Sequence, residues 1–281
     1  MWFFLAILGY ILLAGVFILD KYILSTAKEK PEVYAMYSTL PFFVAFLLWP
    51  FGAESLVGID WAWALASGLT FGLAFWAMFL AFEKGEVSHM SPFIGAVIIV
   101  VVACASSVLF HERLTTTQFI GVAFLVAASF LLSLEQSEKK KGFHSGFLWA
   151  ILCGILFALS YVSAKYLYLQ YSFVTVLMWT KGLGGFVGLG LLLSPRVREI
   201  WKRRKSTFQS HHGLALVVTD KGAAVAGLVL TQYAMARGSV TVVNALGGVQ
   251  YIVMFLGILA LTKWLPHIFR EYFTRRELQM Q

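Results

Sequence analysis

The 281-residue chain is 59% apolar and only 13% charged, and its formal net charge is +8. A soluble domain averages about 45–50% apolar and about 25% charged residues, so this composition excludes an ordinary water-soluble protein. The positive charge lies in short stretches between apolar runs, which is typical of membrane topology signals. We therefore expect an all-α integral membrane protein with lipid around it and no nucleic-acid partner.

Nine segments are near or above the roughly 18–20 residues that cross a bilayer as a helix. Seven carry no charge: Trp2–Leu19, Val33–Ala53, Trp61–Phe82, Met90–Phe110, Leu114–Leu134, Ser145–Ala164 and Gly238–Thr262. The other two, Phe173–Leu193 and Gly213–Ala236, hold Lys181 and the pair Asp220-Lys221. After the ninth segment, apolar residues from Trp264 to Phe273 recur at helical spacing and predict an amphipathic helix on the membrane surface.

Loop charges predict how the chain is oriented in the membrane. When the loops are assigned to alternate sides, one side holds 16 Lys and Arg residues and the other holds three. Basic loops stay in the cytoplasm. We expect a protein of the plasma (inner) membrane with its N-terminus outside and its C-terminal tail cytoplasmic.

Two stretches of the sequence are internal echoes of each other. "AFEKGEVSHMSPFIGAV" at 81–97 returns as "AMARGSVTVVNALGGVQ" at 234–250, an offset of 153, and "DKYIL" at 20–24 returns as "AKYLY" at 164–168, an offset of 144. The pattern predicts a five-helix repeat at 1–135, a basic loop at 136–145, and a second repeat at 146–281 with four helices and the tail. Because five is odd, the two copies lie inverted in the membrane, as in many secondary transporters.

The stretch "KGEVSHMSPFIGAVIIVVVACASSVLFHERLTTTQFIGVAFLVAASFLL" resembles the EamA repeat of the drug/metabolite transporter superfamily. The resemblance rests on a fourth span that contains proline, the turn at 112–115 (Glu-Arg-Leu-Thr), and Gly121 in the fifth span. It implies ten helices, proton- or gradient-driven exchange and small-metabolite substrates. The sequence departs from the pattern after the ninth span, where we expect the tenth helix to be lacking.

Charged residues inside spans usually face a pathway, because exposing them to lipid is costly. Lys181, Asp220 and Lys221 lie near the predicted midplane, so we expect the lysines to give a substrate cavity positive charge and Asp220 to tune them or carry a proton. The alternative is a structural pair or side chains that reach the interface. Asp20, Lys21 and Lys165 lie at helix ends as candidate gating residues, or as interface anchors.

Uncharged polar and aromatic residues are further candidates for substrate binding, the alternative being bonds between helices. They are Trp179, Gln232, Asn244, Gln250 and Tyr251 in the second repeat and Tyr37 in the first. Glycines spaced by four, Gly68 with Gly72 and Gly184 with Gly188, predict close helix packing inside the monomer or a homodimer seam.

Enzyme signatures are lacking, because the sequence holds no HExxH motif, P-loop or GxSxG elbow. We expect no enzyme activity, no cofactor and no metal site. The leading prediction is a secondary transporter that exports small polar, anionic or amphiphilic metabolites by alternating access. The alternatives are a flippase for lipid-linked carriers with the same fold, or a truncated membrane protein that does not transport.

Overall fold

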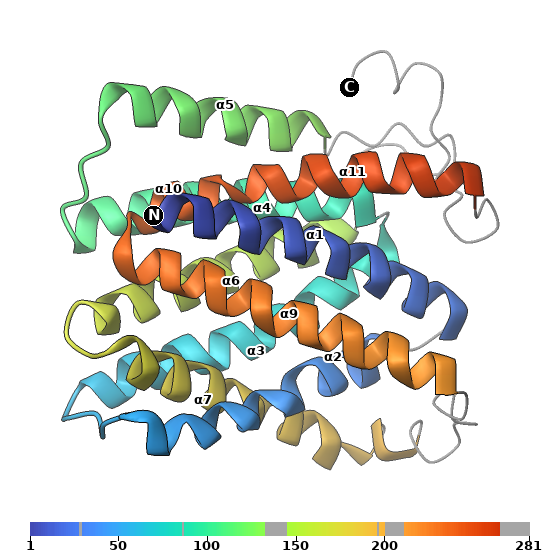
Figure 1. The fold of residues 1–281 in the computed structure, drawn as a ribbon, viewed down its shortest axis with the longest axis horizontal. Helices are drawn as coiled ribbons and strands as arrows, with labels where there is room; N and C mark the ends of the chain where they lie inside the picture. Colours follow the sequence, from blue (N-terminus) through green and yellow to red (C-terminus); the bar gives the residue numbers. More distant parts are fainter. Residues whose placement is uncertain (28–29, 86, 133–144, 196, 200–210, 265–281) are drawn as a thin grey trace.

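The computed structural model describes residues 1–27, 30–85, 87–132, 145–195, 197–199 and 211–264, and this part of the chain is helical without a strand. Its helices are α1 (Trp2–Ala27), α2 (Pro31–Thr39), η1 (Leu40–Phe51), α3 (Asp60–Lys84), α4 (Val87–Leu109), α5 (Thr116–Leu132), α6 (Ser145–Tyr168), α7 (Phe173–Leu193), α9 (His211–Arg237), α10 (Val240–Ala245) and α11 (Gly247–Trp264). Figure 1 shows them as one bundle of roughly antiparallel rods. The predicted surface helix of the C-terminal tail and the basic loop at 136–145 lie outside the described residues.

Each of the nine predicted segments contains a helix in its described part, and seven of them are long and apolar enough to cross a membrane. The remaining two are α5, whose apolar described part runs over Thr116–Ala128, and α9, which carries Asp220 and Lys221. The structure therefore establishes an all-helical membrane protein, and the number of nine crossings stays a prediction.

The second span is not one α-helix as expected. It begins as α2 and continues from Leu40 as the 3-10 helix η1, with Pro41 at its start and Pro50 near its end. Proline removes an amide donor and collides with the carbonyl four residues earlier, so it breaks α-helical hydrogen bonding. The 3-10 form, at three residues per turn, stacks side chains three apart on one side.

This three-residue spacing fits a groove of glycines on α7. A Cβ placed on Gly182 would lie 2.6 Å from the ring of Phe46, and one on Gly185 would lie 2.9 Å from the ring of Phe43. The aromatic side chains of η1 thus occupy the space that side chains on α7 would need. On another side, α7 meets α3 at Gly68, where a Cβ would lie 2.8 Å from the Thr180 carbonyl oxygen. A Cβ on Gly68 would also lie 2.9 Å from the Gly184 amide nitrogen, so these two of the four predicted glycines pack closely inside the monomer.

The ninth span is interrupted between α10 and α11. α10 ends with Leu246 as its C-cap, and α11 begins at Gly247. Broken helices at membrane depth are tolerated where the backbone is buried or lines a cavity.

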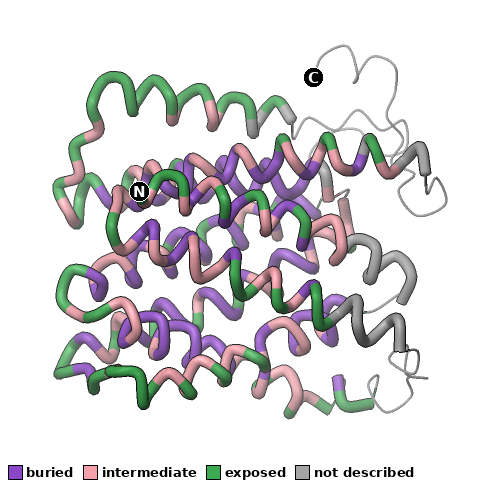
Figure 2. The backbone as a smooth tube through the Cα atoms, viewed as in Figure 1, coloured by how far each residue is buried: buried purple, intermediate pink, exposed green. Residues whose placement is uncertain are grey.

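Helices from the two halves of the chain pack on one another throughout the bundle. α3 packs along α6, α1 packs along α9, and α4 contacts both α6 and α10. A single apolar core joins residues of α1, α2, α3, α4, α6, α9 and α10. Figure 2 shows burial concentrated in these central helices, while α5 is exposed over most of its length.

Candidate functional site

The centre of the bundle holds a cavity of about 120 Å³. One enclosed water needs about 10–15 Å³, so the space is large enough for a small organic molecule or several waters. Its walls come from α1, α3, α4, α6, α9, α10 and α11, which are helices of both halves. Transporters that are built from structural repeats bind their substrates in a central site of this kind, between the two halves.

The cavity wall is aromatic and aliphatic with a few uncharged polar groups. Phe71, Phe75 and Phe157 form an aromatic side, with ring centroids of Phe75 and Phe157 5.5 Å apart. The polar side chains of the lining are Tyr10, Ser91, Tyr161, Thr231, Gln232, Asn244, Gln250 and Tyr251. No charged side chain belongs to the lining in the described part of the chain. Such a surface suits an amphiphilic molecule without a strong net charge.

Four of the predicted binding residues line this cavity: Gln232, Asn244, Gln250 and Tyr251. Gln232 accepts a hydrogen bond of 3.1 Å from the Tyr168 hydroxyl, which fixes its amide. Asn244 donates 2.8 Å to the Val240 carbonyl, just before the break between α10 and α11. The structure thus brings the predicted polar residues of α9, α10 and α11 together at one place.

Tyr251 depends on a glycine in the facing helix. A Cβ at Gly95 would collide with the Tyr251 hydroxyl, so only glycine lets this ring lie against α4. Gly95 lines the cavity too. The sequence analysis did not single out Gly95, Tyr10 or Tyr161, although the repeat offset of 144 pairs Phe17 of the lining with Tyr161 and so offered a signal.

Lys181 is buried behind the cavity wall. Its side chain is 2% exposed, and its Nζ lies 3.4 Å from the centroid of the Phe71 ring. Phe71 lines the cavity and Lys181 does not. The ammonium has no hydrogen-bond partner among the described residues. It is therefore held by a cation–π contact in an aromatic environment.

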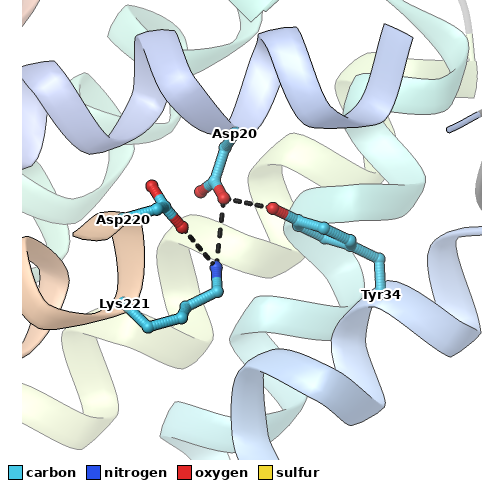
Figure 3. A network of polar contacts seen from close by, with 4 residues as sticks. All are labelled: Asp20, Tyr34, Asp220 and Lys221. Atoms are coloured by element: carbon cyan, nitrogen blue, oxygen red, sulfur yellow. Dashed lines mark hydrogen bonds and ion pairs between the residues drawn. The ribbon is translucent and has the colours of Figure 1, made fainter. Parts of the chain in front are cut away.

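The other predicted charges form a cluster of their own, which Figure 3 shows. The Lys221 ammonium lies 2.9 Å from Asp220 Oδ2 and 3.1 Å from Asp20 Oδ1. Tyr34, which the sequence analysis did not name, donates its hydroxyl to the same oxygen of Asp20. The cluster joins α1, α2 and α9 outside the cavity lining.

The remaining candidates lie away from the cavity. The Trp179 indole donates 2.8 Å to the Glu54 carbonyl and contacts the Trp61 ring. Tyr37 packs beside a small apolar cluster of α2 and α7. Lys165 donates to the carbonyls of Met235 and Gly238, at 2.9 and 2.8 Å. It thereby satisfies carbonyl groups at the C-terminal end of α9.

The Lys21 side chain is not among those the structure describes. No group of three His, Cys, Asp or Glu side chains that could hold a metal ion occurs among the described residues.

Comparison with known proteins places this architecture. Residues 1–134 match the model of the EamA-like transporter family. The matched residues make up just under half of the chain, and together with the apolar helices they support a membrane transporter.

The fold is shared with solved structures. One, described only as "Crystal structure of protein", is similar with a TM-score of 0.63 at 17% identity, and the match covers 99% of this chain and 90% of that chain. No curated protein matches the chain.

Proposed function

We propose that the chain is a secondary transporter that exports small amphiphilic metabolites by alternating access, with the central cavity as its binding site. The lining carries hydrogen-bonding groups and aromatic rings but no charged side chain in the described part of the chain. The sequence suggested polar, anionic or amphiphilic substrates. Of these, the lining favours neutral or zwitterionic molecules, because burying an anion in the cavity without a cation in the wall to pair with it is unfavourable.

The observation that carries the proposal is the symmetry of the cavity lining. Eight pairs of lining residues occupy equivalent positions under the repeat offsets of 144 and 153. The pairs are Leu13 with Phe157, Phe17 with Tyr161, Phe75 with Leu228, Met78 with Thr231, Phe82 with Met235, Ser91 with Asn244, Ile94 with Gly247, and Ile98 with Tyr251. A site built twice from the same positions supports two related halves that share one binding place.

Helix packing supports the same proposal. The offsets make α6 the counterpart of α1 and α9 the counterpart of α3. α3 packs along α6 and α1 packs along α9, so exchanging the repeats exchanges these contacts. The pairing of α4 with α6 corresponds in the same way to that of α11 with α1. Two inverted halves of this kind open the shared cavity to either side by rocking against each other.

Substitution of a cavity glycine tests the proposal. A screen of metabolites by thermal shift first identifies ligands of the purified chain, and a ligand at 100 times its Kd stabilises by about 2.7 kcal/mol. Gly95→Leu fills the cavity beside Tyr251, whereas Gly121→Leu adds the same side chain on α5, where nothing lies within 4 Å. Flux of each ligand is then measured in proteoliposomes.

We expect Gly95→Leu to lose both ligand stabilisation and flux, and Gly121→Leu to keep both. Gln232→Met keeps an unbranched side chain of similar length and removes the amide. It separates blocked access from lost hydrogen bonding and guards against a misfolded Gly95 variant. Unchanged binding and flux in both cavity variants would refute the site. Flux of lipid-linked carriers in place of soluble metabolites would favour the flippase.

A further inference from the structure

A charged cluster at one end of the bundle joins the two halves of the chain. It consists of Asp20 on α1, Tyr34 on α2, and Asp220 and Lys221 on α9 (Figure 3). The ammonium of Lys221 lies between the two carboxylates, at 3.1 Å from Asp20 and 2.9 Å from Asp220. The cluster lies toward the end where α1 finishes and α9 begins, on the right in Figure 1.

The cluster contains one more negative charge than positive charge when all its groups are ionised. Two carboxylates face one ammonium, and the Tyr34 hydroxyl is neutral. Asp220 is fully buried, and its Oδ1 has no hydrogen-bond partner among the described residues. A buried charge without compensation is strongly unfavourable, whereas a proton on this oxygen makes the cluster neutral.

The cation that the described contacts place between the two carboxylates is Lys221. α3 packs on α2 and presents the Phe79 ring to Tyr34, and the ammonium of its Lys84 lies over the Trp149 ring of α6. On α7 the Lys181 ammonium lies against Phe71. In α11, which packs on α1, the described side chains include no charged group.

The cluster lies just beyond one end of the central cavity. Asp20 follows Phe17 of the lining by one turn of α1, and Asp220 precedes Leu228 of the lining by about two turns of α9. At about 1.5 Å per residue, these separations are roughly 5 and 12 Å. A molecule that left the cavity between α1 and α9 at this end would have to pass the cluster.

The opposite end of the bundle has no such charges at the equivalent positions. The repeat offsets carry Asp20 to Ala164, Asp220 to Ser67 and Lys221 to Gly68. There α3 and α6 are joined by hydrogen bonds between Ser67 and Ser160, at 2.9 and 2.8 Å between each hydroxyl and the other residue's carbonyl. One contact between the halves is therefore charged and the other is neutral.

We propose that Asp20 and Asp220 share one exchangeable proton, and that this proton controls the opening of the cavity at this end only. The proton comes from water and binds a carboxylate oxygen, and Lys221 stays an ammonium, so the step changes the cluster by one unit of charge. The proton is favoured over a metal ion because the ammonium already occupies the position between the carboxylates. The binding of the proton stands by itself, and only its link to opening rests on the proposed transport function.

Infrared spectroscopy of the purified full-length chain in lipid nanodiscs tests proton binding without any substrate. A protonated carboxyl gives a C=O band that a carboxylate lacks. We expect this band to grow in the wild type on mild acidification, over the same pH range as the labelling test below, and to be lost in both Asp220→Asn and Asp20→Asn, because one carboxylate and Lys221 then balance. Lys221→Met keeps the band. Asp60→Asn, which alters a buried carboxyl bound to the Tyr171 hydroxyl, leaves it unchanged.

Three results would overturn the proton site. They are a wild type without the band, a band that survives in both asparagine variants, and a band lost in only one of them, which would assign the proton to a single residue. Displacement of the band by sodium ions would also overturn it, since the occupant would then be a metal ion.

Cysteine labelling tests the link to opening. Thr231→Cys places a thiol in the cavity wall, in a background with Cys104→Ser and Cys153→Ala. The rate of labelling from the cluster end is measured in this background with Asp220 and with Asp220→Asn. The ratio of the two rates cancels the effect of pH on the thiol itself. We expect labelling to rise several-fold on acidification only with Asp220 present, and equal rates refute the link. Because the infrared result needs no substrate, the proton site and the transport proposal fail independently.

Discussion

Lys181 allows a direct test of how this bundle tolerates a buried charge. Its ammonium is 2% exposed, contacts the Phe71 ring at 3.4 Å and has no hydrogen-bond partner in the described part of the chain. A lysine at the centre of a membrane helix costs about 2.5–3.5 kcal/mol. A desolvated cation–π contact returns about 2 kcal/mol. The difference leaves the charge destabilising by about 1 kcal/mol.

Lys181→Met removes the charge and keeps the length and apolar stem of the side chain. We therefore expect a gain of about 1 kcal/mol, or a rise in Tm of about 2–4 °C, in thermal unfolding of the purified chain. Lys165→Met is the matched control, because its ammonium donates to the Met235 and Gly238 carbonyls at 2.9 and 2.8 Å. Loss of two charge-assisted bonds should lower the Tm.

A double-mutant cycle isolates the contact with the ring. Phe71→Leu should cost about 2 kcal/mol more when residue 181 is lysine than when it is methionine. If Lys181→Met lowers the Tm as Lys165→Met does, or if the cycle shows no coupling, the assignment of Lys181 to an unpaired cation–π site is refuted.

Two further outcomes follow from the packing and from the loop between α6 and α7. Gly68→Ala should destabilise by about 1–3 kcal/mol in the same thermal assay, because its Cβ would lie 2.8 Å from the Thr180 carbonyl oxygen, whereas Gly190→Ala, with nothing within 4 Å, should not. The hydrogen bond to the Asp60 carboxylate raises the pKa of the Tyr171 phenol. Because the folded pKa lies above the unfolded value, this bond contributes fully below about pH 10 and is lost as the pH rises through the folded value. Absorbance titration should show one tyrosine ionising at lower pH in Asp60→Asn, and an unchanged curve would contradict the assignment.

Apolar run length predicted where the helices lie, because the bilayer imposes a minimum length on each span. It did not predict the change to a 3-10 helix at Leu40, since that depends on how η1 meets the glycines of α7. Residue position likewise did not predict which face of its helix Lys181 or Lys221 presents. The structure places one behind Phe71 and the other between two aspartates.

The polar residues of the cavity were more accessible to sequence reasoning. Gln232, Asn244, Gln250 and Tyr251 line it, and all lie in or beside the segment repeated at offset 153. Tyr34 gave no such signal, because its role depends on a hydroxyl that meets Asp20 across the turn between α1 and α2. Contacts between residues that are distant in sequence depend on tertiary packing, so the sequence alone does not predict them.

The matched spacing of η1 and α7 constrains how this protein can vary. Phe43 and Phe46 are three residues apart, as are the glycines beneath them, Gly182 and Gly185. In a helix with three residues per turn, one inserted residue rotates everything beyond it by about 120°. A single insertion between the two phenylalanines would swing one ring off the groove, and an insertion of three would move it about 6 Å along the helix axis, past its glycine. Relatives that retain this groove should therefore keep two residues between the two aromatic positions.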